Sequence, residues 1–160
     1  MPICYIEQLR SVMRPGTRLL GLDLGSKTIG LAISDPALMV ASPIDTIRRT
    51  KFGKDAAQLE QLMASRDVGG LVLGLPINMD GSEGPRCQST RQFATNLDQY
   101  GTEQPIAFWD ERLSTAAVER VLIDEADMSR RKRASVIDKM AAAYILQGAL
   151  DRLQKITDDA

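Results

Sequence analysis

Three strand-like segments come before the first long helix of this chain, and strand and helix patterns then alternate. The early segments are Arg18–Leu24, Thr28–Ser34 and Pro43–Arg48, of which the first two are close enough to form a hairpin. The later elements are helix Asp55–Ser65, strand Gly69–Pro76, helix Pro85–Tyr100 and strand Pro105–Glu111. Three strands that can form a meander, followed by two strand–helix units, predict an α/β fold with a five-stranded mixed sheet flanked by helices.

Helices are also predicted at both ends of the chain. Apolar residues recur at helical spacing within Pro2–Met13, and Pro15 ends this helix. Ser114 is a suitable N-cap for a helix over Thr115–Glu125, and Ile137–Ile156 has the pattern of a long closing helix. We therefore expect a helical extension over residues 1–17, one domain over residues 18–156 and a short tail over residues 157–160.

The composition fits one globular domain in a reducing environment. A chain of 160 residues with 44% hydrophobic content buries enough apolar surface to fold without disulfides. Cys4 and Cys87 form no CxxC pair, and the lack of histidine excludes the usual zinc sites and all Ser-His or Cys-His catalytic pairs. We expect a cytoplasmic protein without membrane attachment, because no apolar run approaches the roughly 20 residues that span a bilayer.

An ionisable residue interrupts the first apolar strand pattern. Asp23 lies within LGLDLGSK, where an unpaired charge would lose its hydration on burial. Two further acids occupy related places: Glu111 lies just past the last predicted strand, and Asp138 begins the last helix. In an open α/β sheet, ligand sites gather at the carboxyl ends of strands and where the strand order reverses. The predicted topology therefore brings these three acids towards one crevice.

Three neighbouring carboxylates repel one another unless a cation lies between them. Mg²⁺ or Mn²⁺ accepts such oxygen ligands together with water and substrate phosphate oxygens. Two such ions about 3.5–4 Å apart activate a water and stabilise the leaving oxygen of a phosphodiester, and this chemistry needs no histidine. Asp23, Glu111 and Asp138 are therefore predicted to be both the metal ligands and the catalytic residues.

Four motifs in this order carry a family resemblance: GLDLGSKTIGLAISD, LVLGLPINMDGSEGP, FWDERLST and IDKMAAAYIL. Between Leu19 and about Leu153 the chain resembles the RuvX (YqgF) family of Holliday-junction resolvase-like proteins. The resemblance implies a ribonuclease H-like fold and a metal-dependent nuclease that matures the 5′ end of pre-16S ribosomal RNA, resolves Holliday junctions, or does both. Motif by motif, it places the family's acids at Asp23, Glu111 and Asp138. Related resolvases carry their second acid on the strand that corresponds to LVLGLP, so here Glu111 is expected to reach in from the neighbouring strand.

Basic residues are clustered although the net charge is only −1. One cluster lies between Arg48 and Lys54, and the other is the run Arg130–Arg133, which precedes Asp138 and is expected to hold substrate phosphates. The predicted substrate contacts are Lys27, Asn78, Arg112, Arg130, Arg131, Lys132, Arg133 and Lys139. The expected partner is precursor ribosomal RNA or branched DNA, with the ribosome as a further partner, and the protein is expected to be a monomer or a weak homodimer.

The predicted site residues also have structural interpretations. Asp23 would also suit a structural acid that accepts hydrogen bonds from the Gly25–Lys27 turn. Glu111 would suit a surface ion pair, and Asp138 would suit the positive end of a helix dipole. The segment LPINMDGSEG has the composition of a turn, although a loop before a helix N-terminus also suits a phosphate.

Two other functions fit parts of the sequence. GLDLGSKTIG also resembles the first phosphate-binding hairpin of the actin and sugar-kinase group, which would make the protein an ATP-handling phosphotransferase. Those proteins clamp nucleotide between two such domains, and this chain has room for one. The other alternative is a non-catalytic RNA-binding module for ribosome assembly. An aromatic content of 4% leaves few surfaces for base stacking, and the candidates are Phe108, Trp109 and Tyr144.

Overall fold

The computed structural model describes residues 3–113 and 130–159, with side chains over residues 3–112 and 139–156. The predicted helix Thr115–Glu125 lies outside these residues. The elements are β1 (Ile3–Cys4), α1 (Ile6–Val12), β2 (Arg18–Leu24), β3 (Thr28–Ser34), β4 (Ala41–Arg48), α2 (Phe52–Ser65), β5 (Val68–Leu75), α3 (Pro85–Tyr100), β6 (Ile106–Asp110), the 3₁₀ helix η1 (Glu111–Leu113) and α5 (Arg130–Asp159).

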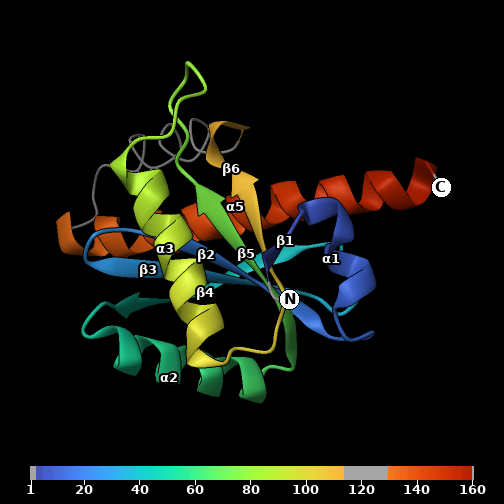
Figure 1. Ribbon diagram of the computed structural model, residues 1–160, viewed down its shortest axis with the longest axis horizontal. Coiled ribbons are helices and arrows are strands. Elements are labelled where there is room, and N and C mark those ends of the chain that lie inside the picture. Colours follow the sequence, from blue (N-terminus) through green and yellow to red (C-terminus); the bar gives the residue numbers. More distant parts are fainter. Residues whose placement is uncertain (1–2, 114–129, 160) are drawn as a thin grey trace.

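The strands form one mixed sheet in the order β1-β6-β5-β2-β3-β4 (Figure 1). Strands β2, β3 and β4 are antiparallel neighbours, whereas β2–β5, β5–β6 and β1–β6 are parallel pairs. The predicted α/β architecture with a three-stranded meander is thereby confirmed. The expected number of five strands is one too few, because Ile3–Cys4 pairs with Ile106–Ala107 instead of belonging to the first helix.

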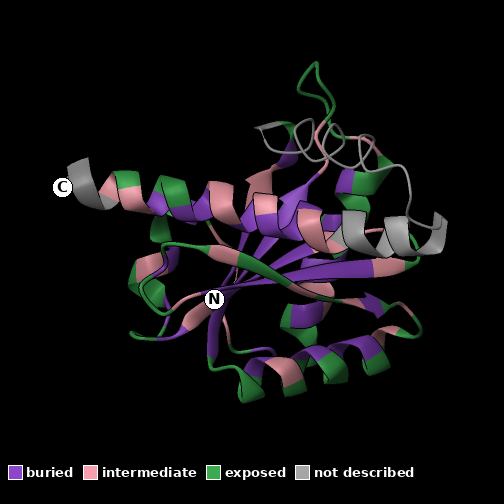
Figure 2. Ribbon diagram, turned by 180° about the vertical axis from the view of Figure 1, so that it is seen from behind, coloured by how far each residue is buried: buried purple, intermediate pink, exposed green. Residues whose placement is uncertain are grey.

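Helices cover both faces of the sheet, with α1 and α5 on one side and α2 and α3 on the other (Figures 1 and 2). The strands contribute alternate residues to the two cores. Leu20 and Leu22 of β2 pack with residues of α2 and α3, whereas Leu19 and Val72 pack with residues of α1 and α5. β5 is buried along its whole length, as the continuous apolar run predicts.

Several element boundaries differ from the predicted ones. β4 begins at Ala41, and α2 begins at Phe52, three residues before the predicted start. α5 begins at Arg130 rather than at Ile137, so the basic run Arg130–Arg133 belongs to the start of the long helix. Within residues 3–113 and 130–159, no helix combines the length and the apolar character needed to cross a bilayer.

Candidate active site

Asp23 lies near the end of β2, on the face of the sheet that α5 covers. This face is defined by Gly21, two residues earlier, because a Cβ atom at Gly21 would lie 2.8 Å from Leu146 Cβ of α5. Residues two apart in a strand point to the same side, so Asp23 is directed towards α5. Its side chain is half-buried. An acid thus replaces an apolar residue at the end of a strand whose other side is fully packed.

Glu111 comes from η1, directly after β6, and its side chain lies over Gly74 of β5. A Cβ atom at Gly74 would be 2.5 Å from Glu111 Oε1 and 2.5 Å from Ile145 Cδ1. Any larger residue at this position would displace the Glu111 carboxylate or push α5 away. The lack of a side chain at Gly74 therefore creates the space into which Glu111 reaches from the neighbouring strand.

The carboxyl groups of Asp23 and Glu111 meet above the sheet. The register of β2 and β5 pairs Leu22 with Leu73, which places Asp23 beside Gly74. Asp23 and Glu111 form a side-chain hydrogen bond. Ionised carboxylates only accept hydrogen bonds, so this contact requires a proton shared between the two groups. The fold has brought two of the three predicted acids together.

The surroundings of Glu111 favour its protonated form. Only 8% of Glu111 is exposed, and this burial raises the pKa of Glu111 above its usual range. The hydrogen bond with Asp23 and the charge of Arg86 lower the pKa of Glu111, whereas the charge of Asp110 raises it. Arg86 was not among the predicted contacts, because only the fold places the start of α3 beside the end of β6.

The backbone of Asp138 lies in α5, four residues before Ala142. The Ala142 carbonyl oxygen would be 3.0 Å from a Cβ atom at Gly21, so this stretch of α5 crosses the sheet beside β2. Residues four apart share one face of a helix. The side chains of Asp138 and of Arg130–Arg133 are not among those that the structure describes, and their roles stay predictions.

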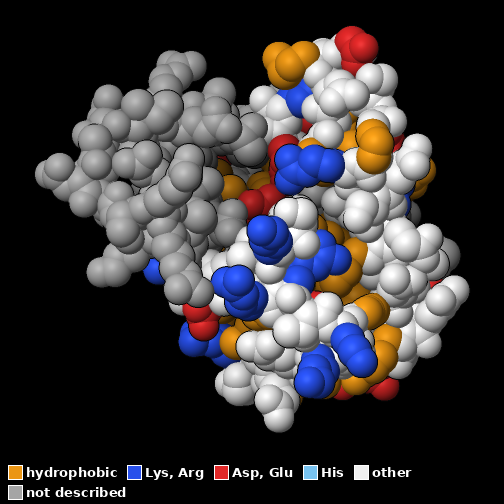
Figure 3. All heavy atoms as spheres, turned by 90° about the vertical axis from the view of Figure 1, so that its left-hand side faces the viewer, with side chains coloured by type: hydrophobic (Ala, Val, Ile, Leu, Met, Phe, Trp, Pro, Cys, Tyr) orange, Lys and Arg blue, Asp and Glu red, His pale blue; other side chains and the backbone are white. Residues whose placement is uncertain are grey.

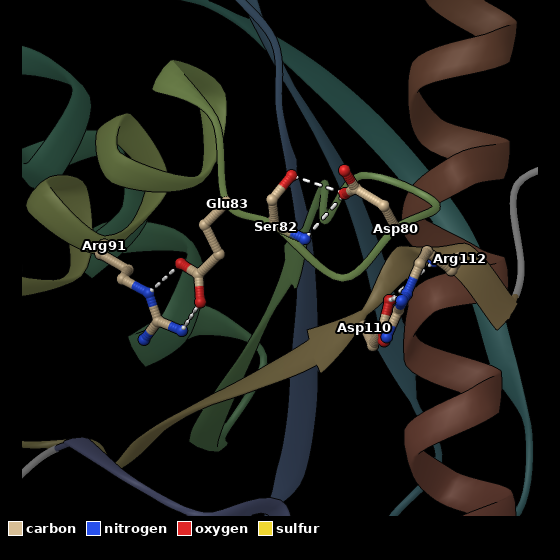
Figure 4. A network of polar contacts seen from close by, with 6 residues as sticks. All are labelled: Asp80, Ser82, Glu83, Arg91, Asp110 and Arg112. Atoms are coloured by element: carbon tan, nitrogen blue, oxygen red, sulfur yellow. Dashed lines mark hydrogen bonds and ion pairs between the residues drawn. The ribbon is translucent and has the colours of Figure 1, made fainter.

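Asp110 and Arg112, the two neighbours of Glu111 in the chain, form an ion pair with each other. Arg112 Nη2 lies 2.6 Å from Asp110 Oδ2, and Arg112 Nε lies 2.9 Å from the same oxygen (Figure 4). The hydrogen bond from Arg112 holds the pKa of Asp110 below its usual range. The guanidinium of Arg112, a predicted phosphate contact, is therefore already bound to a carboxylate.

Asn78 stabilises the loop between β5 and α3. Its Nδ2 donates to Ser82 Oγ at 3.0 Å, and its backbone N–H donates to the Ser82 carbonyl at 3.0 Å. Asp80 accepts hydrogen bonds from the backbone N–H and the hydroxyl of Ser82 (Figure 4). Gly81 adopts a φ of 88°, which favours glycine. These bonds make the segment a compact turn beside η1.

The remaining predicted contacts lie in the turn after β2 and in α5. Lys27 is exposed in the turn that follows β2, four residues after Asp23. Lys139 is half-buried in α5, three residues before Ala142.

The described donors suit a hard divalent cation. Asp23 and Glu111 present carboxylate oxygens on the same face, and a cation between them would remove the need for the shared proton. Residues 3–112 and 139–156 contain no group of three or more His, Cys, Asp or Glu side chains placed to hold a metal ion. The third predicted ligand, Asp138, falls between these two ranges.

The order of the strands and the helices on both faces define the ribonuclease H-like fold class. The solved structure of Thermus thermophilus RuvC in complex with Holliday junction substrate is similar, with a TM-score of 0.55, 13% identity and coverage of 88% of this chain and 97% of that one. A second structure of RuvC from Thermus thermophilus gives a TM-score of 0.51 at 10% identity, with coverage of 88% and 98%.

The family follows from the sequence comparisons. Residues 17–152 match the model of the RuvX Holliday junction resolvase family. A relative from Rhodospirillum centenum is 60% identical over 97% of this chain and 84% of its own length, and one from Roseobacter denitrificans is 66% identical over 86% and 85%. Both carry the name "Putative pre-16S rRNA nuclease". The chain therefore belongs to the RuvX family, and it is a nuclease with the ribonuclease H-like fold.

Proposed function

We propose that this chain is a metal-dependent endonuclease that cleaves precursor 16S ribosomal RNA near its 5′ end. The observation that carries the proposal is the hydrogen-bonded pair Asp23–Glu111, held over Gly74 at the carboxyl end of β2. Two carboxyl groups that share a proton in a largely buried place are costly to the fold, and binding a divalent cation explains why they lie there. The names of the relatives support ribosomal RNA as the substrate.

In this proposal Asp23, Glu111 and Asp138 hold Mg²⁺ or Mn²⁺. Such ions, when bound, supply a reactive water at neutral pH and stabilise the leaving oxygen of the phosphodiester. Glu111 loses its shared proton when the cation binds, because its buried carboxyl group then gains a stronger partner. Arg86, whose charge acts on Glu111, is placed to stabilise negative charge that develops beside the acid pair.

The predicted contacts with the substrate backbone complete the proposal. Lys27 lies in the turn that follows the strand of Asp23, Lys139 lies in α5, and the run Arg130–Arg133 begins the helix that carries Asp138. Arg112 contacts the substrate through Nη1, because its Nε and Nη2 bind the carboxylate of Asp110. Asn78 acts by shaping the loop that borders the site. The protein acts in the cytoplasm, where ribosomes are assembled, and one protomer is sufficient to cut a single RNA strand.

Resolution of a four-way DNA junction is the second candidate function, and the family description and the fold shared with RuvC favour it. Symmetric cleavage of a junction needs two active sites, and hence a two-fold dimer. A side-by-side assay separates the candidates: a 5′-extended 16S RNA fragment and a synthetic junction are each incubated with the protein and Mg²⁺ or Mn²⁺. Cleavage of the RNA supports the proposal. Cleavage of the junction alone would contradict it and favour junction resolution as the function. RNA binding without any cleavage would indicate a non-catalytic assembly module, and Asp23→Asn serves as the inactive control.

A further inference from the structure

Exposed basic side chains of the β2–β3 turn and of the segment from the end of β4 to the first turn of α2 lie together on one face of the molecule. The strand register pairs Thr28 with Arg48, and the backbone N–H of Arg49 donates to the Lys27 carbonyl at 2.8 Å. These connections lie on the left of Figure 1, and Figure 3 shows that side of the molecule with its gathered Lys and Arg side chains. The exposed cations of the two segments are Lys27, Arg48, Lys51 and Lys54.

A row of aromatic rings lies beside these cations. The ring of Phe52, at the start of α2, stacks on Phe93 of α3 with a centroid distance of 5.4 Å. It also stacks on Tyr100, at the end of α3, at 6.2 Å. Phe93 is buried, Phe52 is half-buried, and 43% of Tyr100 is exposed. The row therefore opens to solvent at its Phe52–Tyr100 end, between α2 and α3.

Arg49 joins the aromatic row to the strand that carries Asp23. Its Nη1 donates to the Gly25 carbonyl at 2.6 Å, two residues after Asp23, and its guanidinium lies 5.5 Å from the centre of the Phe93 ring. Arg86 lies two turns before Phe93 in α3, hence on the same side of that helix, and its charge reaches Glu111. The surface between the acid pair and the start of α2 therefore carries Arg86, whose charge acts on Glu111, and Arg49, which contacts both the β2–β3 turn and Phe93.

This surface, which we name the basic–aromatic track, consists of Lys27, Arg48, Lys51, Phe52, Lys54, Arg86 and Tyr100. Within the described part of the chain, the ion pairs Arg14–Asp67, Arg91–Glu83, Arg112–Asp110 and Arg152–Glu7 involve no cation of the track. The nearest acid on α2, Asp55, is buried and accepts hydrogen bonds from Thr50. Grouped cations attract a polyanion, although the chain as a whole has a net charge of −1.

The exposed ring of Tyr100 favours single-stranded over duplex nucleic acid. Bases in a duplex are stacked on one another and offer only their edges, whereas unpaired bases stack readily on aromatic side chains. We propose that the basic–aromatic track binds a single-stranded segment of the substrate that leads away from the bond cleaved at the acid pair. Its phosphates contact Lys51, Lys54 and their neighbours, and one base stacks on Tyr100. This inference rests on the proposed nuclease function and adds that the strand next to the cleaved bond is unpaired.

The test measures binding without divalent metal, so that no cleavage intervenes. Fluorescence anisotropy titrations use a labelled single-stranded RNA of mixed sequence and the same strand in a perfect duplex, at several salt concentrations. The variants are Lys51→Gln/Lys54→Gln and Tyr100→Ala. The matched controls are Arg66→Gln/Lys155→Gln, which removes two exposed cations elsewhere, and Tyr5→Ala, which removes a tyrosine that is 77% exposed.

The expected result is a weakening of binding confined to the track. The lysine pair lowers the magnitude of the log K versus log salt slope by about 0.7 for each phosphate that the variant no longer neutralises. Tyr100→Ala weakens single-strand binding by about 5- to 150-fold, the range measured for one stacked base, and leaves duplex binding unchanged. Tyr100→Phe keeps the ring and binds like the wild type. The unchanged duplex binding of Tyr100→Ala shows that the weakening does not arise from misfolding. Both controls bind like the wild type.

The inference is overturned if Tyr100→Ala binds the single strand as tightly as the wild type does, or if the lysine pair leaves the salt slope unchanged. It is also overturned if the track variants lose duplex and single-strand binding equally, because the track would then contact a duplex backbone. The proposed function fails in a different experiment. If the wild type cleaves no RNA with Mg²⁺ or Mn²⁺, the nuclease proposal is wrong, whatever the track binds.

Discussion

Glu111 shows how one residue connects the fold to the chemistry of the site. Its backbone lies at the end of an ordinary parallel strand, yet its carboxyl group lies over a glycine of the next strand and meets Asp23 there. A residue of this kind destabilises the fold when it is ionised without a partner. The cost is acceptable where a bound cation compensates for it.

Replacement of Glu111 by Gln should stabilise the metal-free protein at neutral pH. The folded state raises the pKa of Glu111 from its ordinary value of 4.5, so the folded protein binds this proton more tightly than the unfolded chain does. Ionisation therefore costs stability once the pH rises above the unfolded value, and no cost remains at pH 4. Thermal melts in EDTA should show a higher Tm for Glu111→Gln than for the wild type at pH 7.5, by about 2–4 °C for each kcal/mol relieved, and no gain at pH 4.

Added metal should instead stabilise the wild type more than it stabilises Glu111→Gln. Addition of Mg²⁺ or Mn²⁺ should raise the Tm of the wild type and leave Glu111→Gln nearly unchanged, because a ligand that binds only the folded state stabilises it. Equal stabilisation of both proteins by the metal would remove Glu111 from the proposed ligand set.

Asp23 and Asp138 should behave as parts of one catalytic unit. Asp23→Asn and Asp138→Asn are each expected to lower the cleavage rate by at least about 10³-fold, and the double variant should be barely slower than either single one. If both residues hold the same metal ions, removal of either one abolishes the function of the site, and removal of the second adds little. Single-turnover cleavage rates of the two single variants and the double variant test whether Asp23 and Asp138 act together. Rate reductions that multiply would mean that Asp138 has a separate role.

At the scale of elements, the approach of α5 to the sheet determines the geometry of the site. The helix crosses close to β2 because Gly21 has no side chain, with Leu146 and the Ala142 carbonyl directly above it. The same helix carries Asp138 one turn before Ala142. Close packing of α5 on the sheet and the position of the third predicted acid therefore depend on the same contact.

Gly21→Ala should consequently impair catalysis as well as stability. The added Cβ would lie 2.8 Å from Leu146 Cβ, so α5 must shift, at a cost of roughly 1–3 kcal/mol. Below the Tm, cleavage should fall by more than 10-fold. Gly69→Ala is the matched control, since its Cβ would collide with Thr17, which is not among the predicted site residues. If both variants lose stability and both keep full activity, the position of α5 does not control the site.

The first turn of α5 should contribute to substrate binding by charge alone. Replacement of Arg130, Arg131, Lys132 and Arg133 by Ser should weaken binding with little regard to base sequence. The magnitude of the log K versus log salt slope should decrease by roughly 0.7–0.9 for each phosphate that these side chains neutralise in the wild type. Filter binding at several salt concentrations checks this, and a quadruple variant with the wild-type slope would mean that these residues do not contact the substrate.

For the whole molecule, the sequence is sufficient to predict the sheet and the approach of Asp23 to Glu111, and the features that it does not predict have physical causes. The long apolar runs and the order of elements determine the meander and the parallel pairs around Leu22 and Leu73. Ile3–Cys4 is too short to be recognised as a strand and exists only because β6 offers an open edge. The contact of Glu111 with Gly74 and the position of Arg86 depend on register between distant segments, which no local pattern contains.

The N-terminal segment should therefore be part of the cooperative unit that unfolds with the sheet. β1 extends the sheet beside β6, and α1 packs against α5 through Leu9, which is 0% exposed, while Glu7 pairs with Arg152 at 3.7 Å. Leu9→Ala is expected to reduce the free energy of unfolding by about 2–5 kcal/mol in a single two-state transition. Cleavage measured well below the Tm should be unchanged, because Leu9 belongs to the apolar core and is not one of the predicted site residues. Urea denaturation followed by circular dichroism, with the exposed-site variant Tyr5→Ala as the control, tests the stability, and a cleavage assay tests the activity. A wild-type midpoint for Leu9→Ala, or a separate early transition, would show instead that residues 1–17 form an independent extension.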